Sequence, residues 1–302
     1  MEIRDLDYFL ACCRARSFTV AAREVHVVQS AMSSAIARLE RELGVSLFDR
    51  SVTPVAVTDH GTVLQAAAQR VLDAVQAARD DVAAASGQVR GTVILGCTLS
   101  TGRLDLGAVL ADLRGRHPGV IVHLRQSLAG SAGNLSAVVD GAMDIALTAS
   151  TSLPGTDQPP RGVILSPLVS EALVFVCPAD HPRRRQPSVT VAHLAEETIL
   201  RFPPGWGVRD TVDRVLGPAP SAIEIADYSL MFELIRAGFG TTLMPLSAMA
   251  DGHAGLLALP VDDPRLRWTL SAAISAGRQP TAATSAVLRA LSEAASPVGP
   301  GS

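Results

Sequence analysis

Apolar residues recur at every third or fourth position in the first part of the chain, which is the spacing of helices with one buried face. They predict helices over residues 5–16, 19–25 and 29–43. Ser17 is a candidate N-cap for the second helix, and Gly44 is a natural end for the third. Two short helices joined by a brief turn, after a preceding helix, predict a helix-turn-helix unit.

The third of these helices has an unusual outer face. Its apolar stripe is formed by Met32, Ile36, Leu39 and Leu43. The opposite face consists mostly of small or hydroxyl-bearing residues, namely Ser30, Ser33, Ser34, Ala37, Arg38 and Arg41. A solvated face would normally carry long charged side chains, so this pattern indicates a helix that approaches another molecule closely.

A hairpin or wing around Pro54 follows, and Thr58 can cap a long helix over residues 59–86. Apolar residues repeat along this helix with spacings of four and three, at Leu64, Ala68, Val71, Val75, Ala78, Val82 and Ala85. A 3.5-residue repeat predicts a coiled-coil contact with a second helix. The alternative is an amphipathic helix that lies on its own domain.

From Gly91 onward the pattern alternates between strands and helices. Strands are expected at residues 92–96, 120–126, 144–150, 171–177, 223–227, 241–245 and 268–276, and helices at 104–119, 134–143, 230–238 and 281–295. This alternation predicts an α/β sheet, whose ligands bind in the crevice beyond the strand ends. Residues 296–302 are rich in Pro, Gly and Ser and are expected to be a disordered tail.

Composition narrows the classes of protein. The chain has 302 residues, of which 48% are hydrophobic and 18% charged, so about two globular domains are expected. A net charge of −3 gives no general attraction to polyanions. The start of the chain has no secretory pattern and no apolar run is long enough to span a membrane, so a cytoplasmic protein without membrane association is expected. The four cysteines show no metal-binding spacing, and neither a metal site nor a cofactor is expected.

The segment DLDYFLACCRARSFTVAAREVHVVQSAMSSAIARLERELGVSLFDR carries a distinctive set of spaced residues: Phe9, Ser17, Phe18, Ala21, Ala22, Gln29, Ser33, Ile36, Leu39, Glu40, Leu43, Gly44, Leu47, Phe48, Arg50 and Thr58. Later segments such as RHPGVIVHLRQ, FPPGWGVRD and RAGFGTTLMP add to this set. Together they make the chain resemble the LysR-type bacterial transcriptional regulators over nearly its whole length.

The resemblance implies an α/β fold class with an all-α N-terminal part. It places a winged helix-turn-helix DNA-binding domain at 1–58 and a linker or dimerisation helix at 59–88. A two-subdomain module similar to periplasmic binding proteins follows at 89–295, with subdomain I at 89–162 and 268–295 and subdomain II at 163–267. The implied partners are double-stranded DNA, a small organic effector with an anionic group as one option, a homodimer or homotetramer, and RNA polymerase.

The same resemblance assigns residues to two sites. The DNA-contacting set is Gln29, Ser30, Ser33, Ser34, Ala37, Arg38, Arg50 and Thr53, with Arg38 reading a guanine or holding a phosphate. The effector-contacting set is Ser100, Thr101, Ser131, Phe202, Trp206, Thr241 and Thr242.

Two departures from the family pattern bear on DNA binding. Val28 stands where a capping Ser is usual, so Ser30 would have to cap the third helix one turn later. Residues 1–58 also hold as many acidic side chains as arginines, so oligomerisation must supply part of the DNA affinity.

Three other functions are alternatives to that of a ligand-switched regulator. A redox-responsive regulator would use Cys97 or Cys177. A solute-binding protein would account only for the second half of the chain. An α/β enzyme would need a nucleophile or phosphate-binding motif, and neither GxSxG, GxGxxG nor a P-loop is present.

Overall fold

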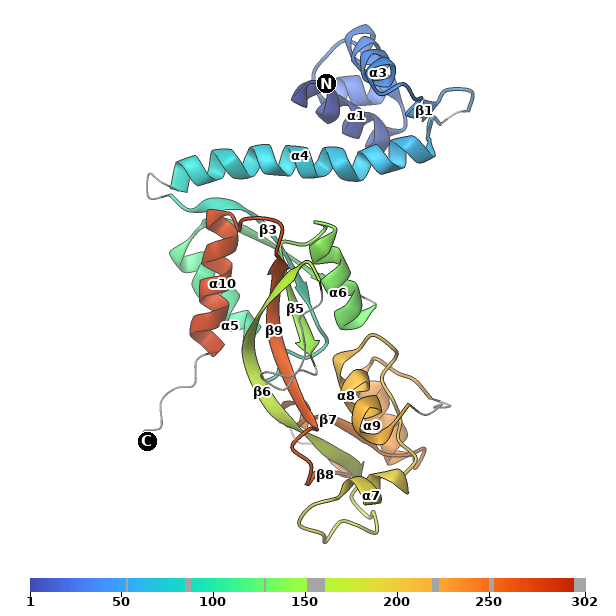
Figure 1. Ribbon diagram of the computed structural model, residues 1–302, viewed down its shortest axis with the longest axis vertical. Coiled ribbons are helices and arrows are strands. Elements are labelled where there is room, and N and C mark those ends of the chain that lie inside the picture. Colours follow the sequence, from blue (N-terminus) through green and yellow to red (C-terminus); the bar gives the residue numbers. More distant parts are fainter. Residues whose placement is uncertain are drawn as a thin grey trace. The chain divides into compact units, whose positions relative to one another are not determined.

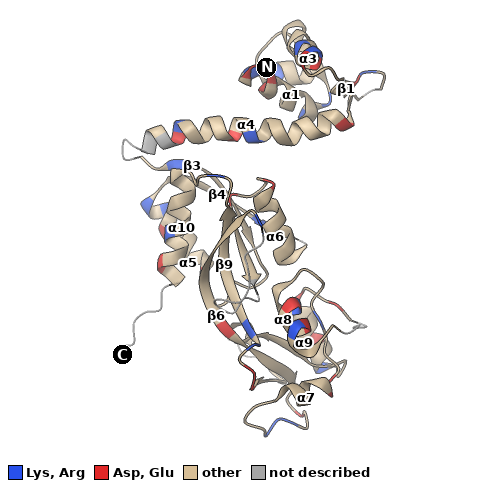
Figure 2. Ribbon diagram, viewed as in Figure 1, with Lys and Arg blue, Asp and Glu red and all other residues tan. Residues whose placement is uncertain are grey.

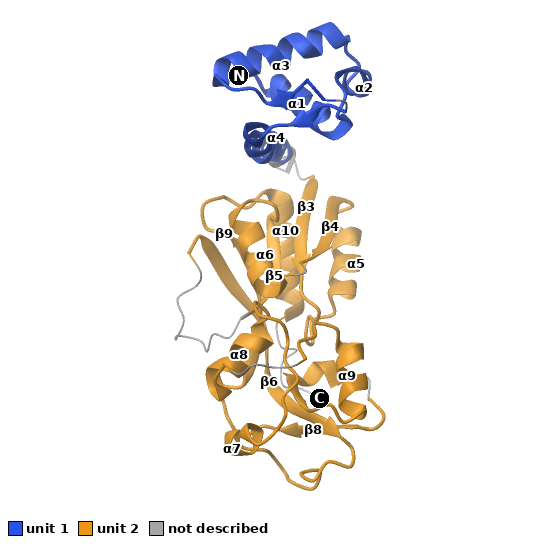
Figure 3. Cartoon of the chain, turned by 90° about the vertical axis from the view of Figure 1, so that its right-hand side faces the viewer, with its two compact units in different colours: residues 1–83 blue, residues 84–302 orange. Residues whose placement is uncertain are grey.

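The computed structural model describes residues 1–52, 54–84, 88–127, 129–150, 161–218, 223–249 and 253–295 (Figure 1). The chain divides into two compact units, residues 1–83 and 84–302, each with its own hydrophobic core (Figure 3). The tail at 296–302, for which disorder was predicted, lies outside the described residues.

The first unit is mainly helical, as predicted. Its elements are α1 (Ile3–Ala15), α2 (Phe18–Glu24), α3 (Gln29–Leu43), β1 (Phe48–Asp49), β2 (Ala56–Val57) and α4 (Asp59–Ala84). Ser17 caps α2, because the Val20 backbone N–H donates to its Oγ at 3.4 Å. Gly44 ends α3 in the left-handed conformation, with φ of +71°, which glycine adopts without steric cost.

The wing and the long helix follow directly. The strands β1 and β2 form a two-stranded antiparallel sheet. Thr58 caps α4, since the Gly61 backbone N–H donates to Thr58 Oγ1 at 3.0 Å. Thr58 Oγ1 also donates to the Ser46 carbonyl at 2.8 Å, which ties the start of the helix to the residues before the wing.

The apolar repeat of α4 serves two purposes. Ala68 is buried, and Leu64 and Leu72 pack against the core of the first unit. Val71 and Val82 are instead 40% and 73% exposed, Ala78 is exposed and Val75 is half-buried. The amphipathic alternative therefore describes the first part of the repeat, while Val71, Ala78 and Val82 form an exposed apolar stripe on the described part of α4; Ala85 lies outside the described residues.

The second unit is an α/β module. Its elements are β3 (Arg90–Cys97), α5 (Leu106–Arg116), β4 (Gly119–Gln126), α6 (Gly130–Val139), β5 (Ile145–Ser150), β6 (Val163–Pro178), α7 (Val191–Ala195), α8 (Gly207–Leu216), α9 (Tyr228–Arg236), β7 (Thr242–Pro245), the 3₁₀ helix η1 (Leu246–Met249), β8 (Leu256–Pro260), β9 (Arg267–Ser275) and α10 (Ala282–Ala295). The sheet order is β4-β3-β5-β9-β6-β7, with β8 also paired to β6. The strand β3 runs parallel to β4 and β5, whereas β9 and β6 pair antiparallel.

Two long strands, β6 and β9, run through both halves of this module (Figure 1). The first part of β6 pairs with β9, and its last part pairs with β7 and β8. Residues 163–166 pair with residues 272–275, beside β5, and so extend the sheet of the first half. The sequence predicted that subdomain II begins at residue 163. This residue is the first of β6, and because β6 belongs to both halves of the module, the predicted boundary falls on a shared strand.

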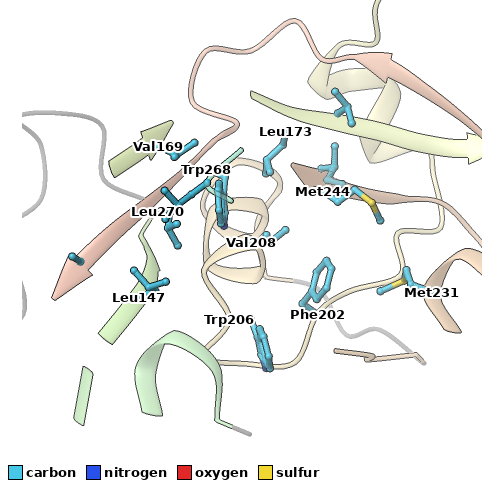
Figure 4. Packing of buried hydrophobic residues seen from close by; sticks show 14 of the residues in the cluster. Leu147, Val169, Leu173, Phe202, Trp206, Val208, Met231, Met244, Trp268 and Leu270 are labelled. Carbon is cyan, nitrogen blue, oxygen red and sulfur yellow. The ribbon is translucent and has the colours of Figure 1, made fainter. Parts of the chain in front are cut away.

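One predicted strand is missing from the second half. Residues 223–227 were expected to form a strand, but this segment makes only the isolated bridge between Glu224 and Arg201 before α9 begins. The core of the module lies between the shared strands and their covering helices. It includes the fully buried Leu147, Leu173 and Leu270 (Figure 4).

Candidate functional sites

The outer face of α3 is the first candidate site. Met32, Ile36 and Leu39 are completely buried beneath the helix. Leu43, which was assigned to the same stripe, is 40% exposed, so the buried stripe ends one turn earlier than predicted. The outward side chains are short and polar: Gln29, Ser30 and Ser34 are exposed, and Ser33 and Ala37 are half-buried. This face can bring backbone and hydroxyl groups close to another surface.

The N-terminus of α3 differs from the prediction in one respect. Val28 is the N-cap and makes no side-chain capping bond, as its apolar side chain requires. Ser30 does not act as a later cap, because the helix already begins at Gln29 and Ser30 lies within its first turn. Gln29 Nε2 instead donates to Ser33 Oγ at 2.8 Å on the outer face.

The two arginines assigned to DNA contact are both engaged inside the first unit. Arg38 donates through Nε, at 3.3 Å, and through Nη2 to the carboxylate of Asp5, which is buried in α1. Arg50 Nη2 lies 3.0 Å from Glu40 Oε2, and its guanidinium carbon lies 5.0 Å from the Phe18 ring centre. Both arginine side chains remain about half exposed. Acidic and basic residues are mixed over α1 and α3 (Figure 2), and Thr53 lies outside the described residues.

The second candidate site is a narrow hollow within the α/β module. Its empty volume is about 300 Å³ counted to its open mouth. It is lined by Thr98, Leu99, Ser100, Ser131, Ala149, Phe202, Trp206, Gly207, Val208, Tyr228 and Trp268. Four of these, Ser100, Ser131, Phe202 and Trp206, belong to the predicted effector-contacting set.

Serine hydroxyls line the side of the hollow formed by the first half. Ser131 lies in the first turn of α6, and its Oγ accepts a hydrogen bond from the Ala149 backbone N–H at 3.0 Å. Ser100 follows β3, and its Oγ accepts from the Gly102 N–H at 3.1 Å. The Tyr228 hydroxyl from α9 is hydrogen-bonded to Ser100 and joins the two sides. Burial raises the pKa of Tyr228 above its usual value, so this phenol stays protonated at neutral pH.

Aromatic side chains form most of the opposite wall. Phe202 and Trp206 belong to one loop that leads into α8, and Trp268 lies on β9 (Figure 4). This loop is held from behind by Arg209, whose Nη1 donates to the Phe202 carbonyl at 3.0 Å and to Glu224 Oε1 at 2.7 Å. The aromatic wall therefore rests on a charged support in the second half.

The two halves touch directly beside the hollow, where glycines make close approach possible. A Cβ on Gly207 would lie 2.4 Å from the Ala149 carbonyl oxygen. A Cβ on Gly130 would lie 2.9 Å from the nearest Trp206 ring atom. The Ala132 N–H also donates to the Gly205 carbonyl at 3.1 Å across this contact. The cleft is therefore closed around the hollow.

Three members of the predicted effector set lie elsewhere. Thr101 Oγ1 donates to the Leu104 carbonyl at 2.8 Å within a local turn. Thr241 and Thr242 donate to the carbonyls of Thr198 and Leu200, at 3.4 and 2.9 Å. Their hydroxyls thus join β7 to the neighbouring segment rather than lining the hollow. Tyr228 and Trp268 were not predicted, because neither follows a recognisable motif and only the closed sheet brings them to this site.

The cysteines are poorly suited to oxidant sensing. Cys177 is completely buried, and burial raises the pKa of its thiol to about 11. Burial also raises the pKa of Cys97 above its ordinary value. A protonated thiol is a weak nucleophile, so neither side chain has the lowered pKa typical of redox-sensing cysteines.

Within the described ranges, no three side chains of His, Cys, Asp or Glu group closely enough to hold a metal ion. None of the helices in the part of the chain that the structure describes combines the length and apolar character of a membrane-spanning segment.

Comparisons with known proteins match both units. Residues 3–62 match the model for the bacterial regulatory helix-turn-helix protein, lysR family, and residues 86–296 match the model for the LysR substrate binding domain. A probable hydrogen peroxide-inducible genes activator of Mycobacterium avium is 30% identical over 286 residues, covering 91% of this chain and 89% of that protein. The regulator CfxR of Cupriavidus necator is 28% identical over 272 residues, covering 85% and 81%.

Solved structures share the fold. A full-length OxyR variant from Pseudomonas aeruginosa superposes with a TM-score of 0.71 at 23% identity, covering 97% of each chain. Full-length CbnR in complex with its target DNA gives a TM-score of 0.64 at 19% identity, covering 97% of this chain and all of that one.

Proposed function

This chain belongs to the LysR family of bacterial regulatory helix-turn-helix proteins, and from that premise we propose that it binds double-stranded DNA sequence-specifically and regulates transcription in response to a small organic effector. On this view it acts in the cytoplasm, as a regulator and not as an enzyme, and it reaches RNA polymerase through the DNA that it occupies.

The observation that carries this proposal is the outer face of α3. A helix that buries Met32, Ile36 and Leu39 yet presents short polar side chains outward can enter the major groove without steric conflict. The exposed hydroxyls of Ser30 and Ser34 suit phosphate oxygens or base edges. We assign the predicted contact set, from Gln29 to Arg50, to this interaction.

One α3 helix alone does not supply enough affinity for DNA, so α3 helices from two or more copies of the chain must contribute. The first unit has no excess of positive charge, with nine arginines against eleven acidic residues, and Arg38 and Arg50 are partly neutralised by acidic partners. A dimer or tetramer joined through the exposed stripe of α4 would place two α3 helices on one interrupted inverted repeat. The target we propose is therefore a pair of half-sites.

The effector site that we propose is the hollow in the α/β module. It collects Ser100 and Ser131 from the first half with Phe202, Trp206 and Tyr228 from the second. A ligand that contacts both walls would stabilise one relative arrangement of the two halves. That difference in affinity between arrangements is what a switch requires.

The DNA part is tested by retardation assays with the full-length protein and the intergenic DNA upstream of its gene, against unrelated DNA of equal length. Ser34→Asp places a negative charge on the proposed DNA-facing side of α3 and is expected to weaken specific binding at least tenfold. Gln65→Asp, an exposed position on α4, adds the same charge elsewhere and serves as the matched control. Equal binding by Ser34→Asp and its control would exclude α3 as the reading helix.

A further inference from the structure

The hollow gathers most of the large aromatic side chains that are scarce in this chain. The protein has only two tryptophans and two tyrosines, and both tryptophans and one tyrosine line this single hollow. Phe202 adds a fourth aromatic side chain, and its ring meets that of Tyr228 edge to face at 5.5 Å. Aromatic rings present large flat apolar surfaces, so this lining favours a flat ligand.

Among the described residues, those that line the hollow include no charged side chain. Their polar groups are the hydroxyls of Thr98, Ser100, Ser131 and Tyr228 and the indole N–H groups of Trp206 and Trp268, together with backbone N–H and C=O groups. Hydroxyls can both donate and accept hydrogen bonds, so they suit a neutral polar group of either kind. A full positive charge to balance an anionic ligand is missing from the lining.

A carboxylate lies behind one end of the hollow. Glu171 is the cross-strand partner of Trp268, and a Cβ on Gly102 would lie 2.6 Å from Glu171 Oε1 and 2.7 Å from the Trp268 ring. Glu171 is buried and accepts hydrogen bonds from the Ser247 N–H and Oγ, at 2.9 and 3.0 Å. Among the described residues, no Arg or His forms an ion pair with it. An anion in the hollow would therefore face an additional like charge.

The N-termini of α6 and α8, by contrast with Glu171, favour a negative charge in the hollow. Both begin beside the hollow, and neither N-cap residue, Ala129 or Trp206, makes a side-chain capping bond. The helix dipoles and first-turn N–H groups attract negative charge, but only as partial charges, and the Ala132 N–H of α6 is already bonded to the Gly205 carbonyl. Such partial charges can hold an anion, but here the buried Glu171 carboxylate opposes them. The same N–H groups bind a neutral carbonyl oxygen without that opposition.

We propose that the hollow takes an uncharged compound with one flat ring and one hydrogen-bonding group. The ring packs against Phe202, Trp206 and Trp268, and the polar group reaches the hydroxyls of Ser100, Ser131 and Tyr228. The hollow is narrow, so a ligand with more than one ring does not fit between its walls. This inference rests on the proposed effector role of the hollow and narrows the chemistry of the effector.

The test uses benzamide, benzoate and benzylamine, which share one ring and carry a neutral, a negative and a positive group at pH 7.5. Because both tryptophans line the hollow, the intrinsic Trp fluorescence of the full-length protein reports on this site, and calorimetry provides a second measurement. Benzamide is expected to bind at least tenfold more tightly than either charged compound. Ser100→Leu, which fills the hollow, is expected to abolish benzamide binding.

Glu171→Gln gives an independent check. It removes the negative charge while keeping an oxygen for Ser247, so it is expected to improve benzoate binding and leave benzamide binding nearly unchanged. The proposal is overturned if benzoate or benzylamine binds the unmodified protein as tightly as benzamide, or if no benzamide binding is detected. DNA retardation on the same preparation keeps the two proposals apart, since loss of DNA binding contradicts the regulatory role and leaves the ligand preference standing.

Discussion

Arg38 on α3 donates two hydrogen bonds to the buried carboxylate of Asp5 on α1. The same carboxylate accepts a hydrogen bond from the Glu2 backbone N–H at 3.3 Å, at the start of α1. This pair fixes α3, the proposed DNA-reading helix, to the first helix of the unit. Arg38 therefore has a structural duty whether or not it also touches DNA, and its replacement has consequences beyond a lost contact.

The first prediction concerns the coupling of this pair. Arg38→Met is expected to lower the Tm of the first unit, because it leaves the Asp5 carboxylate buried without a counter-charge. Asp5→Asn combined with Arg38→Met should lose less than the sum of the two single changes, since the double variant buries no charge. Thermal unfolding followed by circular dichroism measures this. Arg41→Met, at an exposed position on the same helix, is the control. Strictly additive losses would show that the two side chains are not coupled.

The second prediction concerns oligomerisation through α4. Val71→Asp with Val82→Asp should leave the fold of the chain intact, because both side chains are exposed in it. If the stripe packs against a second copy, the two charges become buried without partners, at a cost of at least about 3 kcal/mol. The dimer should then weaken on the order of a hundredfold. Sedimentation at micromolar concentration measures the change, and Thr62→Asp with Gln65→Asp is the control. A double variant that sediments like the parent would place the interface elsewhere.

The third prediction tests the close contact beside the hollow. Gly207→Ala would bring a methyl group within 2.4 Å of the Ala149 carbonyl oxygen, which is backbone and cannot move aside by itself. It should destabilise the α/β module by about 1–3 kcal/mol. Gly115→Ala, on α5, meets nothing within 4 Å and should be neutral or slightly stabilising, since Ala favours helices. Denaturant unfolding compares the two. Equal stability would mean that the halves are not in contact at this point.

The fourth prediction concerns stability in alkaline solution. Burial raises the pKa of the Cys12 thiol from 9.0 to about 12. The unfolded thiol ionises above pH 9 while the folded one does not, so its contribution to stability is complete below pH 9 and declines as the pH rises toward 12. Cys12→Ala should therefore reduce the slope of Tm against pH above pH 9 and leave the slope between pH 7 and 8 unchanged. An unaltered slope above pH 9 would show that this thiol ionises equally in both states.

The first unit was largely predictable because its signals are local. The capping by Ser17, the end of α3 at Gly44 and the cap at Thr58 each depend on neighbours within a few positions. The Asp5–Arg38 pair was not predictable, because it joins residues 33 positions apart and sequence patterning indicates only that Arg38 faces outward. The apolar repeat of α4 likewise hid a difference between its two parts, since periodicity alone does not reveal which positions pack against the core of the first unit.

The hollow was predicted in part. Ser100, Ser131, Phe202 and Trp206 lie in phrases that resemble the family pattern, and all four line it. Tyr228 and Trp268 come from α9 and β9, and they reach the hollow only when the shared strands bring distant segments together. Thr241 and Thr242, which were also assigned to the effector site, donate to neighbouring backbone, a role that a hydroxyl at a strand start serves equally well.

The antiparallel pairing of β9 with β5 and β6 also governs the order in which the α/β module can fold. The ribosome completes β3, β4 and β5 long before it reaches β9 and α10, which finish the first half of the sheet. The hundred or so residues between β5 and β9 form the second half. Until the ribosome has synthesised them, β9 is absent and the edge of β5 stays unpaired. Pairing between such distant segments makes the folding slow and leaves that edge open to aggregation during synthesis. Chains truncated before residue 267 should therefore fail to fold in either half.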